Sequence, residues 1–202
     1  MTEKLYEQNA YVKEFTAEVL ECKACDNFYK IVLNKTAFFP EGGGQASDKG
    51  SLAGVEIFDV QIENENIYHY ATKPLEIGSE VIGEINFDRR FNFMQNHTGE
   101  HIVSGIAHRL FGVNNVGFHL GEELVTLDFD KELTREQLDE IEYLANQKVW
   151  QNLPVTAYFP TNEELKSIEY RSKKEINDAV RLVEIKDTDI CACCAPHVNF
   201  TG

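Results

Sequence analysis

The chain has 202 residues, of which 43% are hydrophobic and 26% charged, so it can form one large domain or two small ones with apolar cores. Its longest apolar runs, such as residues 103–107, are far shorter than the roughly 20 residues that cross a bilayer, which excludes a helical membrane protein. The formal net charge of −15 argues against a broad nucleic-acid surface, because phosphate binding requires lysine and arginine.

The N-terminal half is expected to be a small β-barrel or sandwich. The chain starts without an apolar segment of the secretory type, so we expect a cytoplasmic protein. Short runs of alternating apolar residues, bounded by turn-forming residues, then predict five strands between Tyr11 and Phe87. They cover residues 16–22, 28–33, 55–61, 67–71 and 81–87.

A glycine-rich loop interrupts these strands at Gly42-Gly43-Gly44-Gln45. Three consecutive glycines disfavour a strand or a helix, because glycine loses more conformational entropy on folding than any other residue. The loop is either a plain turn or a segment whose backbone amides approach a ligand and donate to a carbonyl or phosphate oxygen. The sequence leaves both interpretations open.

A change of hydrophobic period from two to about 3.6 near residue 89 predicts a helix that Gly112 ends, and with it a domain boundary near residue 88. Thr134 and Gln137 predict a second helix that starts with a capping box, with Leu138, Ile141, Ala145 and Val149 facing inward. Thr161 and Glu164 repeat that signature. Together with expected strands at 124–129, 155–159 and 180–185, residues 89–202 are predicted to form an α+β domain with helices packed on an antiparallel sheet.

Two clusters of metal-binding side chains lie in this second half. His97 and His101 are four residues apart in the first expected helix, so their imidazoles leave the same face. The segment Cys191–His197 adds three thiols and an imidazole, and soft sulfur combined with nitrogen favours zinc. Five cysteines in all, an odd number, also suit a metal site in a reducing compartment better than a disulfide framework. Spacing does not choose among Cys191, Cys193 and Cys194.

Two further features bear on function. Glu100 lies between the two histidines, but not in the H-E-x-x-H order of a metalloprotease, so we expect either a carboxylate on the helix surface or an acceptor for a ligand imidazole. Arg89-Arg90 and residues 166–174 are candidate basic patches for local RNA contact, or else solvated helix faces.

The motifs together resemble the editing domain of alanyl-tRNA synthetases and the freestanding AlaX-type editing proteins. The resemblance runs from about Tyr11 to Gly202. The motifs that carry it are Thr36–Gln45, Asp48-Lys49-Gly50, Arg90 with Met94, His97–His101, Asp128-Phe129 and Cys193–Val198.

The resemblance implies a deacylase that hydrolyses mischarged tRNA, either Ser-tRNA(Ala) or Gly-tRNA(Ala), at its acceptor end. It implies one zinc ion per chain, bound by His97, His101, Cys193 and His197, and it thereby selects Cys193. It also implies that Thr36 meets the serine hydroxyl and that the loop of Gly42, Gly43, Gly44 and Gln45 lines the aminoacyl pocket. From their chemistry, we expect the backbone amides of this loop to polarise the ester carbonyl. Neither a membrane nor DNA is an expected partner.

Three alternatives stay open. Cys194-Ala195-Pro196 stands where the alanine family has Gly-Gly-Thr, and Pro196-His197-Val198 is similar to the threonyl-tRNA synthetase editing domain, so serine removal from tRNA(Thr) is one of them. A zinc ion with four protein ligands is structural, whereas one with an open coordination position is catalytic. The second alternative is therefore a binding module that zinc stabilises and that has no enzymatic activity. The chain is also either a compact trans-acting editor or a cut piece of a longer protein.

Overall fold

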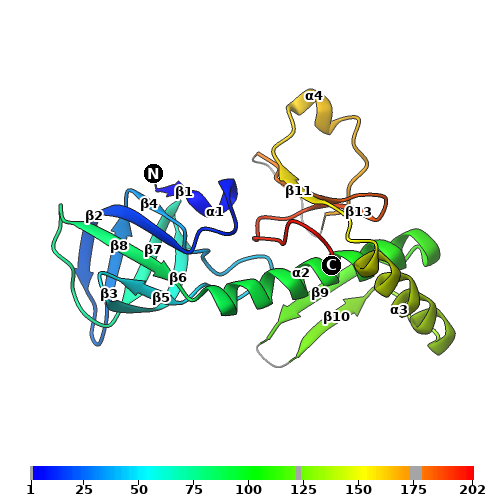
Figure 1. The fold of residues 1–202 in the computed structure, drawn as a ribbon, viewed down its shortest axis with the longest axis horizontal. Helices are drawn as coiled ribbons and strands as arrows, with labels where there is room; N and C mark the ends of the chain where they lie inside the picture. Colours follow the sequence, from blue (N-terminus) through cyan, green and yellow to red (C-terminus); the bar gives the residue numbers. More distant parts are fainter. Residues whose placement is uncertain (1, 122–123, 173–178) are drawn as a thin grey trace. The chain divides into compact units, whose positions relative to one another are not determined.

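The computed structural model describes residues 2–121, 124–172 and 179–202 (Figure 1). The chain divides into two compact units, Met1–Phe93 and Met94–Gly202. We expected a division near residue 88, before the first long helix, whereas this division falls inside that helix, α2 (Phe87–Phe111). The α+β class is confirmed, and the strands pair mainly in antiparallel fashion. None of the helices in the described ranges combines the length and apolar character that a membrane crossing requires.

Six strands of the N-terminal unit close into a barrel in the order β2-β3-β7-β6-β5-β8 (Figure 1). Buried and exposed residues alternate along β2 and β8, as expected for strands with one face toward a core and the other toward solvent. The buried positions are apolar, for example Val19, Ile31 and Ile57. The bounds are β2 (Glu14–Ala24), β3 (Tyr29–Leu33), β5 (Gly50–Leu52), β6 (Val55–Glu63), β7 (Asn66–Ala71) and β8 (Glu80–Ile85).

Three short elements complete this unit. Strand β1 (Glu3–Lys4) pairs in parallel with β4 (Lys35–Thr36), and helix α1 (Leu5–Gln8) follows β1 directly. None of them was expected from the sequence, because two-residue strands carry no readable hydrophobic period.

A buried ion pair joins Arg90 to Asp48 in the N-terminal unit. The Arg90 guanidinium donates to both carboxylate oxygens of Asp48 and to the carbonyls of Ala37 and Ala10. Asp48 also accepts the backbone N–H of Phe39 at 2.6 Å. The Arg90 side chain is 0% exposed. It therefore contributes neither to a basic patch for RNA nor to a solvated helix face, and both predictions for this residue were wrong. It instead fixes the ends of the loop that carries the glycines.

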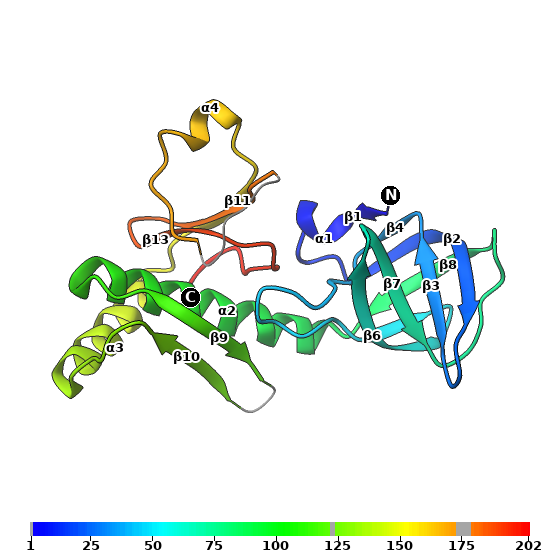
Figure 2. The ribbon, with the colours of Figure 1, turned by 180° about the vertical axis from the view of Figure 1, so that it is seen from behind.

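In the C-terminal unit, residues of α2 lie between a three-stranded antiparallel sheet on one side and a β-hairpin on the other (Figure 2). The core of this unit gathers Ile102 and Ile106 of α2 with Ile141, Val155 and Val183. The sheet has the order β11-β12-β13, with β11 (Val155–Tyr158), β12 (Leu182–Ile185) and β13 (Asp189–Ala192). The hairpin consists of β9 (Asn115–Leu120) and β10 (Val125–Phe129), and the other helices are α3 (Arg135–Trp150) and α4 (Asn162–Leu165).

The predicted helix ends are confirmed. Capping boxes start α3 at Thr134 and α4 at Thr161, and Gly112 follows the last residue of α2 with a φ of +59°. The expected inward face of α3 was partly wrong. Ile141 is buried and Ala145 packs against the core, whereas Leu138 and Val149 are exposed, because only a narrow stripe of this helix meets the core.

One glycine allows α2 to approach the turn before β13 closely. A methyl group built at Gly105 would come within 2.7 Å of the Cβ of Asp189 and 2.9 Å of the carbonyl oxygen of Thr188. Gly105 lies one helical turn after His101 on the same face of α2. The absence of a side chain at this position therefore sets the distance between His101 and Asp189.

Candidate metal centre

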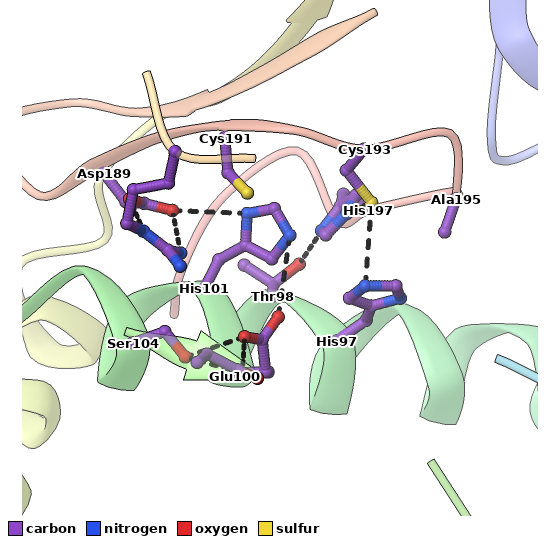
Figure 3. Close-up of polar contacts among 12 residues, drawn as sticks. His97, Thr98, Glu100, His101, Ser104, Asp189, Cys191, Cys193, Ala195 and His197 are labelled. Atoms are coloured by element: carbon purple, nitrogen blue, oxygen red, sulfur yellow. Dashed lines mark hydrogen bonds and ion pairs between the residues drawn. The ribbon is translucent and has the colours of Figure 1, made fainter. Parts of the chain in front are cut away.

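Four candidate ligands from two segments converge in the C-terminal unit (Figure 3). α2 supplies His97 and His101, and the segment that follows β13 supplies Cys193 and His197. The ligand atoms of all four lie within 4.8 Å of one another. The Cys193 Sγ atom is 3.6 Å from Nε2 of His97 and 3.4 Å from Nε2 of His197. All three histidines are buried.

The donor set suits zinc. Three imidazole nitrogens and one sulfur form a borderline-soft set of the kind that zinc binds with tetrahedral geometry. These four residues fit the ion that the sequence predicts. Of the other two cysteines in the segment Cys191–His197, Cys194 is exposed, and Cys191 is buried in a second group with His101 and Asp189.

Thr98 fixes the proton of His197. The Thr98 hydroxyl donates to the carbonyl of Met94 at 2.8 Å, so its oxygen accepts at 3.0 Å from Nδ1–H of His197. The remaining nitrogen, Nε2, then carries the lone pair, and this is the atom that faces Cys193. The imidazole is held in the tautomer that binds a metal through Nε2.

Asp189 does the same for His101. Its Oδ2 lies 3.4 Å from Nδ1 of His101, and the guanidinium of Arg171 donates to both oxygens at 2.7 Å. Burial would raise the pKa of the Asp189 carboxyl, but hydrogen bonds from His101 and Arg171 outweigh burial and hold it below the usual value. The negative charge of Asp189 favours a proton on the nearer nitrogen of His101, Nδ1, which leaves the lone pair on Nε2.

The turn that carries Cys193 is anchored through its backbone. Arg181 donates from Nη1 to the carbonyls of Cys193 and Ala195, both at 2.9 Å, and the N–H of Cys193 donates to the carbonyl of Arg181. Burial raises the pKa of the Cys193 thiol, and the nearby Cys194 adds to this. The thiol therefore ionises when a cation binds and replaces its proton.

The groups that orient the ligands were not predicted from the sequence. Asp189 lies 88 positions after His101 in the chain, and no spacing rule connects them. Thr98 is adjacent to His97, but only the fold shows that its hydroxyl reaches His197. Of the second basic patch, Arg171 belongs to this network, whereas Lys173 and Lys174 lie outside the described residues.

Thr36 and the glycine loop, the other residues singled out in the sequence, lie in the N-terminal unit. The Thr36 side chain is fully buried. Its oxygen lies 2.8 Å from Nε2 of His69 and accepts the N–H of Phe38. Nδ1 of His69 lies 3.1 Å from the carbonyl oxygen of Ile31, which can only accept a hydrogen bond, so Nδ1 is the donor. Nε2 of His69 therefore accepts a hydrogen bond from the Thr36 hydroxyl. Burial lowers the pKa of His69 to about 4, which keeps it neutral.

The glycine loop is a tight turn. The backbones of Gly42 and Gln45 pair through two hydrogen bonds, and Gly43 and Gly44 between them have φ of +62° and +83°. Two consecutive residues with positive φ are typical of a type I′ turn, which favours glycine. Gly43 and Gly44 are exposed at its tip, whereas Gln45 is buried.

Comparison with known proteins shows similarity to alanyl-tRNA editing proteins and to an alanine–tRNA ligase. Residues 3–89 match the family described as tRNA synthetases class II (A). The chain is 32% identical over 209 residues to alanyl-tRNA editing protein Aarsd1-A of Xenopus laevis, with 96% of this chain and 51% of that protein covered. For alanyl-tRNA editing protein Aarsd1 of Rattus norvegicus the identity is 30%, with 96% and 52% covered.

The alanine–tRNA ligase of Ignicoccus hospitalis is also similar, with 35% identity over 214 residues that cover all of this chain and 23% of the ligase. The chain thus spans about half the length of the editing proteins and a smaller part of the ligase. These relatives confirm the predicted resemblance to alanyl-tRNA editing domains.

Proposed function

We propose that this relative of the alanyl-tRNA editing proteins is a deacylase that hydrolyses the ester between a wrong amino acid and the terminal ribose of tRNA(Ala). The wrong amino acid is serine or glycine. The observation that carries the proposal is the convergence of His97, His101, Cys193 and His197 in a chain with these relatives. We also propose a cytoplasmic location, because a cysteine that binds a metal as a thiolate suits a reducing compartment.

One zinc ion held by these four residues is part of the proposal. When bound, zinc supplies Lewis-acid chemistry, which polarises a carbonyl or activates water if a coordination position is open. Thr98 and Asp189 support it by holding the lone pairs of His197 and His101 toward the other ligands. The metal centre is thus prepared for a cation before one binds.

In the N-terminal unit, we assign the selection of the amino acid to Thr36. The Thr36 hydroxyl donates to His69, and one of its two oxygen lone pairs accepts the backbone N–H of Phe38. The second lone pair can accept one more hydrogen bond. Thr36 would therefore accept a hydrogen bond from a serine hydroxyl, which alanine lacks. Because the side chain is buried, this contact requires a local opening of the unit.

The glycine turn has a separate proposed role. Since Gly42 and Gln45 bond to each other, the amides of Gly43 and Gly44 are the donors assigned to the ester carbonyl. The buried Gln45 anchors the turn.

Deacylation assays test the proposal. The purified protein should contain about one zinc per chain and release serine from Ser-tRNA(Ala) faster than alanine from Ala-tRNA(Ala). His97→Ala and Cys193→Ala should lose this activity, whereas His108→Ala, an exposed histidine of the same helix, should keep it. Normal deacylation by zinc-free protein would contradict the metal role. Preference for Ser-tRNA(Thr) would change the substrate to threonine tRNA.

A binding module without enzymatic activity is the second candidate, and the four-ligand cluster favours it. Four protein ligands can complete the coordination of zinc and leave no position for water. In that case the wild-type protein binds zinc and releases no amino acid from any of the three charged tRNAs.

A further inference from the structure

His69 is the buried partner of Thr36 inside the N-terminal unit. It lies on β7 and is 0% exposed. Its Nδ1 lies 3.1 Å from the carbonyl oxygen of Ile31, the residue opposite it on β3, and its Nε2 lies 2.8 Å from the hydroxyl oxygen of Thr36. The ring of Phe38 lies nearly perpendicular to the imidazole, with 5.4 Å between the ring centroids. The imidazole is therefore held at both of its nitrogens.

These contacts determine where the Thr36 hydroxyl directs its proton. The carbonyl oxygen of Ile31 only accepts, so a neutral His69 has its proton on Nδ1 and its lone pair on Nε2. Burial lowers the pKa of His69 to about 4, so the imidazole is uncharged at neutral pH. The Thr36 hydroxyl therefore donates to His69, and its oxygen accepts the backbone N–H of Phe38 at 3.1 Å. The lone pair that remains on Thr36 can only accept.

An oxygen that can only accept distinguishes amino acids by whether they carry a donor. Serine has a hydroxyl that can donate to this lone pair, whereas alanine, which lacks only that hydroxyl, cannot. A Thr36 hydroxyl whose proton is already bonded to His69 does not have to reorient when serine arrives, so less of the binding energy is lost in ordering it. A site prepared in this way favours the substrate that completes its hydrogen bonds.

We propose that His69 is a positioning residue for amino-acid selection, which takes the proton of Thr36 and thereby presents the free lone pair of Thr36 to the hydroxyl of serine. His69 itself does not touch the amino acid. The carbonyl of Ile31 keeps the imidazole in the tautomer that this role requires. The inference rests on the proposed role of Thr36 and adds to it the residue that makes the Thr36 hydroxyl an acceptor.

The readout is the serine preference, which is the ratio of kcat/KM for Ser-tRNA(Ala) to kcat/KM for Ala-tRNA(Ala). Both values come from one preparation, so a smaller folded fraction lowers them equally and leaves the ratio unchanged. His69→Leu removes the acceptor at similar size and should lower the serine preference about three- to tenfold, the effect of one neutral hydrogen bond. His69→Gln can place its carbonyl oxygen where Nε2 lies, and should keep most of the preference. Tyr68→Phe, on the other side of β7, is the control and should not change it.

A double variant tests whether His69 acts through Thr36. Thr36→Val removes the hydroxyl and should lower the serine preference at least as far as His69→Leu does. The double variant Thr36→Val/His69→Leu should then lower it no further than Thr36→Val alone, because two residues of one hydrogen-bonded chain are not additive. Additive losses in the double variant overturn the inference, and so does a serine preference of His69→Leu equal to that of the wild type.

The remaining outcomes are separable. If His69→Leu does not fold, His69→Asn decides. The asparagine amide can still donate to the Ile31 carbonyl but is too short to accept from Thr36, so a wild-type serine preference in this variant overturns the inference. An unchanged preference in Thr36→Val shows instead that Thr36 does not select the amino acid. Failure of the wild-type protein to release serine overturns the proposed function.

Discussion

The Thr98 hydroxyl lies 3.0 Å from Nδ1 of His197, although the two residues are 99 positions apart in the chain. Because the same hydroxyl donates to the carbonyl of Met94, it can serve His197 only as an acceptor. The Thr98 hydroxyl in α2 thus determines that Nε2, and not Nδ1, of His197 has the lone pair that a metal could use.

Thr98→Val should lower zinc affinity about tenfold, since valine keeps the shape of threonine and removes the acceptor for His197. Thr98→Ser retains the hydroxyl and should stay near wild type. Chelator competition measures both. Equal affinities for the two variants would show that the tautomer of His197 does not depend on Thr98.

Asp189→Asn should weaken zinc binding by about 10- to 100-fold and also destabilise the metal-free protein. The amide can no longer hold the Nδ1 proton of His101 as firmly, and the Arg171 guanidinium loses the buried charge that it pairs with. Asp139→Asn on the exposed face of α3 is the control for chelator competition and urea unfolding. An unchanged zinc affinity in Asp189→Asn would contradict the assigned link to His101.

His69 should make the N-terminal unit less stable in acid. Its folded pKa of about 4 lies below the ordinary 6.5, so between these values the unfolded chain binds a proton that the folded chain does not. Stability from the neutral His69 is complete above about pH 6.5 and is lost as the pH falls toward 4, by up to about 3 kcal/mol. Urea unfolding of His69→Gln should depend less on pH in this window than that of the wild type or of His108→Gln.

Asp48→Asn should cost about 3–5 kcal/mol of unfolding free energy, because it leaves the buried Arg90 without its counter-charge. The isosteric amide keeps the volume, so the effect comes from charge and not from a cavity. Asp26→Asn, in an exposed turn of the same unit, should change stability by less than about 0.5 kcal/mol. Circular dichroism during urea titration distinguishes the two variants.

Gly44→Ala should destabilise the N-terminal unit by about 1–2 kcal/mol, since a side chain at a φ of +83° is strained. Gly44→Asn should cost less, because asparagine tolerates this conformation. If both variants fold, a larger loss of deacylation than of stability would support the proposed role of the turn in the N-terminal unit. Equal stability of Gly44→Ala and wild type would contradict the type I′ assignment.

The sequence predicted those features that depend on local signals. Capping residues such as Thr134 and Thr161 define helix starts within three positions, and Gly112 defines a helix end in the same way. Strands β5 and β13 were not expected, because they are too short to show a period and depend on partners far along the chain.

In the candidate site, too, the sequence predicted only the features that have a local signal. His97 and His101 could be paired by helical spacing alone. Spacing could not separate Cys193 from Cys191, because both thiols approach α2 and only the fold shows that Cys193 joins His97 and His197, whereas Cys191 lies with His101 and Asp189. The burial of Arg90 and Glu100 was equally unpredictable, since charged residues are buried only with partners, and Asp48 and Asn115 lie elsewhere in the chain.

The close approach at Gly105 has a consequence for how this domain can vary. A single added methyl group would push α2 away from Asp189, and with it His101 from the carboxylate that orients it. Alanine, normally the best substitute for glycine in a helix, is therefore a poor one here. A position with no functional group thus constrains the candidate metal centre, because it sets how closely His101 and Asp189 approach each other.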